Sequence, residues 1–120
     1  MIMEVFMDRL KMLEMILDSY PYKLVFVDTD FVIRYMNRAA RYHYYQVRGY
    51  RDLIGRSLFD CHNAHSQEMI RTAVEKLKHH ANEMYLGVTP DNQRFYLNPV
   101  RDEHGSLVGF FERFELNLQK

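Results

Sequence analysis

The chain has 120 residues, the size of one domain, which leaves room for one hydrophobic core. Its 16 basic and 16 acidic residues give a formal net charge of zero, which argues against a nucleic-acid binder and gives no reason for attraction to an anionic membrane. The single cysteine, Cys61, cannot form an internal disulfide, and no uncharged run is long enough for a signal peptide or a transmembrane helix. We therefore expect a cytoplasmic domain.

Residues Met1 to Ser19 are dominated by strong helix formers and are followed by Pro21, which predicts an N-terminal helix. Apolar residues cover more than half of its circumference, so the helix needs cover on two sides. Because so small a domain has little interior to bury a helix twice, we expect a homodimer interface here. The alternative is a helix packed deep in one core. The expected interface residues are Ile2, Val5, Phe6, Met12, Leu13 and Ile16.

Two short strands are expected next, at Lys23 to Asp28 and at Val32 to Met36, because both runs are rich in β-branched and aromatic residues. Asn37 is a candidate N-cap for a helical middle region, since its side chain can accept from free amide groups. That region continues with a short helix at Tyr42 to Gln46. The pattern therefore predicts a hairpin followed by short helices.

The clearest helix of the sequence is expected at Ser66 to His80, where apolar residues recur at spacings of three and four. Three strands follow, at Glu83 to Val88, Arg94 to Val100 and Leu107 to about Leu116, with turn residues between them. Hairpins at both ends of the chain predict an antiparallel sheet with helices on one face, an α+β architecture.

Three segments in this order resemble PAS domains. They are LVFVDTDFVIRYMNRAA, RGYRDLIGRSLFDCH and NPVRDEHGSLVGFFER, and they span about Lys23 to Glu115. The first resembles the opening hairpin and the Asn-x-Ala helix start of the family, and the second its Gly-Tyr and Leu-Ile-Gly-Arg-Ser-Leu segment. The third resembles its last two strands, joined by an Asp-Glu-x-Gly turn. The stretch GRSLFDCHNAHS also resembles a subgroup with Cys-His and a nearby Ser.

The resemblance implies a PAS-like five-stranded antiparallel sheet that cups a small cavity against the middle helices. It divides the chain into a flanking dimerisation helix, residues 1–20, and a PAS domain, residues 21–120. It further implies a sensory module that binds a small molecule or cofactor and signals through homodimer contacts to a downstream protein or output domain. The alternative is a ligand-free interaction domain, in which the fold serves dimerisation alone.

The densest cluster of reactive groups is Cys61-His62-Asn63-Ala64-His65-Ser66, at the expected start of a helix. His62 or His65 can ligate a haem iron from the cavity wall. Cys61 with the histidines can bind a transition metal or undergo thiol redox chemistry, although three ligands without a fourth make a weak metal motif. Alternatively, Cys61 is a small buried hydrophobe and the histidines are polar caps. The sequence leaves these alternatives open, and no dedicated metal site is expected.

Strand alternation and the resemblance place further side chains in the cavity. Phe95, Leu97 and Phe111 are expected to face inward, and Arg113 shares the face of Phe111. An inward arginine needs an acidic partner or an anionic ligand group, whereas at the end of a strand it can lie in solvent. The expected ligand contacts are Tyr45, Leu58, Cys61, His62, His65, Ser66, Phe95, Leu97, Phe111 and Arg113.

Two chemistries are disfavoured. Photoactive flavin PAS domains carry a cysteine three residues after the Gly of a Gly-Arg pair, where this chain has Leu58 after Gly55, so a flavin–cysteine adduct is not expected. Haem and non-covalent flavin stay open as cofactors. No catalytic motif is present, so we do not expect an enzyme, and a small enzyme with His62 or His65 as base is the weakest alternative.

Overall fold

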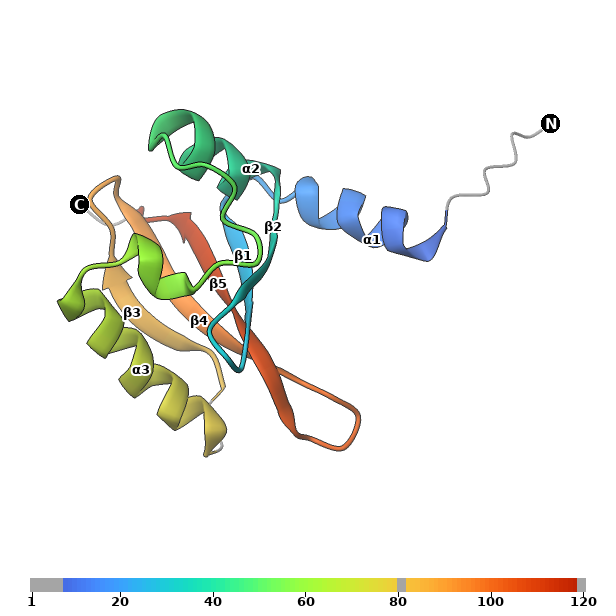
Figure 1. The fold of residues 1–120 in the computed structure, drawn as a ribbon, viewed down its shortest axis with the longest axis vertical. Helices are drawn as coiled ribbons and strands as arrows, with labels where there is room; N and C mark the ends of the chain where they lie inside the picture. Colours follow the sequence, from blue (N-terminus) through green and yellow to red (C-terminus); the bar gives the residue numbers. More distant parts are fainter. Residues whose placement is uncertain (1–7, 80–81, 119–120) are drawn as a thin grey trace.

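The computed structural model describes residues 8–79 and 82–118, and of Cys61 it describes only the backbone. Five strands form one sheet in the order β2-β1-β5-β4-β3, and every neighbouring pair is antiparallel. The helical segments between β2 and β3 lie on one side of this sheet (Figure 1). The predicted α+β, PAS-like architecture is therefore confirmed.

The elements lie close to their predicted positions. In chain order they are α1 (Arg9–Asp18), β1 (Leu24–Asp28), β2 (Ile33–Met36), α2 (Arg38–Arg41), η1 (Tyr42–Val47), η2 (Leu58–Cys61), α3 (Ala64–Lys78), β3 (Met84–Val88), β4 (Gln93–Arg101) and β5 (Leu107–Leu116). Helix α3 begins at Ala64 rather than Ser66, because Asn63 caps it by accepting a hydrogen bond from the Ser66 amide at 2.8 Å. Of the predicted N-terminal helix, the part before Asp8 lies outside the described residues.

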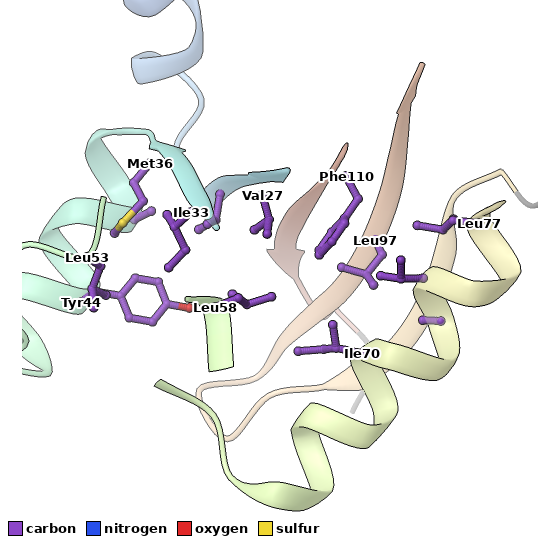
Figure 2. Packing of buried hydrophobic residues seen from close by; sticks show 14 residues of the cluster. Val27, Ile33, Met36, Tyr44, Leu53, Leu58, Ile70, Leu77, Leu97 and Phe110 are labelled. Atoms are coloured by element: carbon purple, nitrogen blue, oxygen red, sulfur yellow. The ribbon is translucent and has the colours of Figure 1, made fainter. Parts of the chain in front are cut away.

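The hydrophobic core fills the space between the sheet and α3. Figure 2 shows Ile70 and Leu77 of α3 pointing toward Leu97 of β4. Tyr44 and Leu58 reach into the same cluster from the middle of the chain, so the irregular segments are fixed by burial rather than by long helices. The core therefore determines how η1, η2 and α3 face the sheet.

Asn37, which is completely buried, ties three elements together. Its side-chain oxygen accepts from Leu24 N at 2.9 Å and from Ala40 N at 3.0 Å, so it caps α2 as predicted and also holds the start of β1. Its side-chain nitrogen donates to Tyr22 O at 2.9 Å and to Leu17 O at 3.2 Å. One amide group thus connects the end of α1 to β1 and α2.

Asp18, the last residue of α1, makes a second connection. It accepts hydrogen bonds from the Tyr35 hydroxyl at 3.0 Å and the Arg38 amide at 2.8 Å, and it pairs with Arg41 at 3.4 Å. Burial opposes ionisation, but these hydrogen bonds and the Arg41 charge lower the pKa of Asp18. The end of α1 is therefore anchored to the hairpin and to α2.

The rest of α1 extends away from the domain body (Figure 1). None of its ten residues, all in the described part of the chain, is buried. Large apolar side chains are instead exposed along it, including Leu13, Met15 and Ile16 at 48%, 51% and 59%. Burial deep in the core of one chain is therefore excluded for this helix.

Among the described residues, no helix has both the length and the apolar character needed to cross a bilayer.

Glu112 lies inside the protein on the inner face of β5, where it is 1% exposed. Its Oε2 atom has no hydrogen-bond partner among the described residues. Burial raises the pKa of Glu112 to about 8, although the nearby Lys23 charge acts in the opposite direction. The carboxyl group is therefore mostly protonated at neutral pH.

Replacement of Asn37 with alanine is expected to lower the free energy of unfolding by about 3 kcal/mol, because several buried backbone groups lose their partner together. Asn63→Ala is the matched control, since it removes an exposed N-cap of the same residue type and should cost about 1 kcal/mol. Urea denaturation measures both values. Equal losses in the two variants would contradict a connecting role for Asn37.

Glu112→Gln is expected to flatten the dependence of stability on pH. The folded-state pKa of Glu112 lies above the ordinary value, so the folded protein holds this proton more tightly than the unfolded chain does. The wild type should therefore lose stability relative to the variant as pH rises from 5 to about 8, by a few kcal/mol in total. Urea denaturation across this range tests it, with exposed Glu103→Gln as the control. Parallel curves for wild type and Glu112→Gln would refute it.

Candidate functional site

A pocket of about 850 Å³ opens between the end of the sheet and the middle segments. One wall is the β3–β4 hairpin, the other consists of η1 and the start of α3, and the floor includes Phe95 and Phe114. The lining residues are Lys23, His43, Tyr44, Arg48, Tyr50, Asp60, His62, Asn63, Ser66, Met69, Ile70, Leu86, Gly87, Val88, Thr89, Pro90, Asp91, Phe95 and Phe114. Its volume falls within the range of small-molecule sites.

Both walls depart from regular geometry. The segment predicted as a short helix at Tyr42 to Gln46 is a π-helix, a rare form that often occurs at functional sites. It places His43 and Tyr44 in the pocket wall. On the opposite side, the pairing of β3 with β4 shifts register between Tyr85 and Gly87, a bulge that re-aims the strand beside the pocket.

Lys23 is the buried charge of the pocket. Its side chain is only 7% exposed, and its Nζ lies 4.1 Å from the centroid of the Phe114 ring and 3.7 Å from Asp91 Oδ2. Burial lowers the pKa of Lys23, while Asp91 and Glu112 act in the opposite direction. A lysine held this way remains a candidate to bind a negative group.

The two histidines of the pocket favour their neutral forms. Burial and the charge of Lys23 lower the pKa of His43. Burial and the charge of Arg48 lower that of His62, against a raising effect of its hydrogen bond to Leu58. The charged side chains of the lining are therefore Lys23 and Arg48 on one hand and Asp60 and Asp91 on the other.

The predicted ligand contacts are only partly brought together. His62, Ser66 and Phe95 line the pocket. His65 is exposed in the first turn of α3 and is not among the lining residues described. The side chain of Cys61 lies outside the described residues, so its proposed redox or metal role stays a prediction.

Three other predicted contacts belong to the core beneath the pocket. Leu58 and Leu97 are buried at 1% and 0% exposure. The hydroxyl of Tyr45 accepts from Leu53 N at 3.0 Å and donates to Asp52 at 3.3 Å, so Tyr45 fixes the loop after η1. Leu97 does face inward, as the alternation predicted.

The predicted inward orientation of Phe111 and Arg113 is wrong. Phe95 pairs with Phe114 and Leu97 with Glu112 across β4 and β5, so the even-numbered residues of β5 share the inner face. Arg113 lies on the outer face, where it binds Glu83 at 2.9 Å and Glu115 at 3.0 Å and covers the Tyr96 ring. It needs no anionic ligand there.

Sequence reasoning missed Lys23, Arg48 and Glu112. The sequence did contain a signal for the inward face of β5. The even positions of this strand are the more apolar set, with Val108, Phe110, Phe114 and Leu116. Glu112 interrupts that set and disguises it. For Lys23 and Arg48 no local signal exists, because both lie at the ends of elements and meet only through the tertiary fold.

Haem and metal ions each require particular side-chain ligands. His62 Nδ1 donates to Leu58 O at 2.9 Å, which fixes the tautomer whose Nε2 carries the lone pair, as in histidines that bind haem iron. His62 would be the residue to hold a haem iron here, and haem stays a prediction. Among the side chains that the structure describes, no three His, Cys, Asp or Glu groups are placed to hold a metal ion.

Comparison with known proteins agrees with the fold. No curated protein matches the sequence. Solved structures that resemble it include a C-terminal domain from Streptococcus mutans, with 18% identity and a TM-score of 0.71 over 92% of this chain and 85% of that one. The PAS domain of Bordetella pertussis BvgS has 16% identity and a TM-score of 0.67 over 94% and 89%.

A sensory box sensor histidine kinase from Vibrio cholerae also resembles the chain, with 16% identity and a TM-score of 0.62 over 90% of this chain and 91% of that one. At these identities the structural likeness shows the fold alone. The sequence profile described as PAS domain matches residues 13–115, which is most of the chain. The chain belongs to the PAS domain family.

Proposed function

We propose that this PAS domain is a sensory module that binds a small molecule in the pocket between η1, α3 and the β3–β4 hairpin. The pocket itself carries the proposal, because it joins a buried cation and several aromatic side chains in about 850 Å³. Resemblance to a domain of a sensor histidine kinase adds support for a signalling role. Catalysis is not part of this proposal.

We further propose that α1 mediates a homodimer through its exposed apolar side chains. Met12, Leu13 and Ile16 are exposed at 42%, 48% and 59%, whereas the other predicted interface residues, Ile2, Val5 and Phe6, lie outside the described part of the chain. A helix with so much exposed apolar surface is stabilised when a second copy covers it. The division into a dimer helix, residues 1–20, and a PAS body, residues 21–120, is part of this proposal.

The proposed signalling role is supported by a chain of contacts that connects the pocket to helix α1. Tyr44 lines the pocket from η1, which continues directly from α2. The N-cap of α2 is Asn37, whose side chain binds Leu17 O near the end of α1. A ligand that moves η1 therefore acts on α1 through two adjoining short elements.

The ligand proposal predicts that protein purified from its native host contains a bound small molecule. An absorption spectrum reveals haem or flavin, and mass spectrometry of the denatured extract identifies an uncoloured compound. Adding the compound back should shift amide NMR signals of pocket residues. If nothing is recovered and no small molecule binds, the alternative of a ligand-free interaction domain is supported instead.

The dimer proposal predicts that Ile16→Glu weakens self-association by at least about 100-fold, because each copy would bury an unpaired charge. Lys11→Glu is the matched control, since it adds negative charge to the polar side of the same helix. Analytical ultracentrifugation compares the two with the wild type. A wild-type protein that stays monomeric at high concentration, or equal effects of both variants, would disprove it.

A further inference from the structure

We propose that the ligand of this pocket is a small organic acid whose carboxylate binds Lys23 and Arg48, and whose apolar body packs on Phe95 and Phe114. The inference rests on the proposed sensory function and adds the chemical class of the ligand. Four features of the described residues carry it.

The first feature is the incomplete pairing of Lys23. Its ammonium group has three donors, yet its one ion pair with a described residue, to Asp91, is 3.7 Å long and therefore outside hydrogen-bond range. Glu112 does not make up the deficit, because it forms no ion pair with Lys23 among the described residues, and burial favours the protonated form of its carboxyl group. A buried cation in a low dielectric is strongly stabilised by an added anion.

The second feature is Arg48, at the end of η1. It donates to the Tyr50 hydroxyl at 3.2 Å and lies over the Tyr50 ring, but it forms no ion pair with the residues that the structure describes. The charge of Arg48 contributes to lowering the pKa values of Lys23, His43 and His62. Arg48 lines the same pocket as these three residues. An arginine beside a lysine offers a fork of donors that suits a carboxylate.

The third feature is the number of negative charges that the lining residues can balance on a ligand. Asp91 and Asp60 also line the pocket, and Asp60 pairs with Arg56 at 3.6 Å. A doubly charged phosphate would face these carboxylates as well as the two cations. A monoanion balances the pocket better, which favours a carboxylate over a phosphate.

The fourth feature is the shape of the floor. The rings of Phe95 and Phe114 are stacked, with centroids 4.9 Å apart and planes 8° apart, and Lys23 Nζ lies above the Phe114 ring. Leu86 and Met69 face the same pocket. A ligand anchored at Lys23 therefore meets an aromatic and aliphatic surface, as an acid with a hydrocarbon body requires.

Matched pairs of acids and their primary amides test the inference, because each pair shares the same hydrocarbon body and exchanges a charged carboxylate for a neutral group of similar size. Phenylacetate, phenylpropionate and isocaproate are titrated beside their amides at pH 7, and binding is read from the NMR amide shifts of pocket residues. At least one acid should bind about tenfold more tightly than its amide. Lys23→Met and Arg48→Met should each reduce that preference by at least about fivefold, and Lys76→Met, at an exposed lysine of α3, should leave it unchanged.

Lys23→Met should fold, because an apolar side chain of similar length replaces a buried charge, and Arg48→Met alters an exposed residue and gives a second reading. Acids and amides that bind equally, or acids that do not bind, would overturn the inference. Recovery of haem, flavin or a neutral or cationic compound from the native protein would also overturn it, yet leave the sensory proposal intact. Failure of every probe together with an empty extract would remove both.

Discussion

The hydrogen bonds of one buried side chain, Asn37, organise the relation between the flanking helix and the domain. Its amide satisfies backbone groups of β1 and α2 on one side, and of α1 and the segment after α1 on the other. Because Asn37 is completely buried, the elements cannot shift independently without leaving its polar atoms unpaired. The position of α1 therefore depends on the state of the domain body.

In the pocket, by contrast, the two cationic side chains lack close partners of opposite charge among the described residues. Lys23 is buried 3.7 Å from Asp91 and near the buried Glu112, and Arg48, which directly follows η1, lines the same pocket. A buried charge such as that of Lys23 costs stability, and ligand binding is the role that we propose for it. The π-helical turn of η1 places Tyr44 between this site and the elements held by Asn37.

Much of the fold could be predicted from the sequence because its signals are local. Asn37 and Asn63 are caps that depend on a few neighbouring residues, and the strands follow from β-branched and aromatic runs between turns. The site could be predicted only in part. Alternation separates the two faces of β5, but Glu112 interrupts the more apolar, inward-facing set, and the prediction for Phe111 chose the wrong face. Lys23 and Arg48 come together only through the tertiary fold.

The central claim is that the pocket holds a small molecule whose presence bears on α1. A crystal structure of the protein purified from its native host tests this most directly. The account predicts electron density between Lys23 and the Phe95–Phe114 floor, in contact with η1, and a second copy of the chain against α1. Pocket walls collapsed onto one another, with side chains of the protein filling the space beside Lys23, would contradict it.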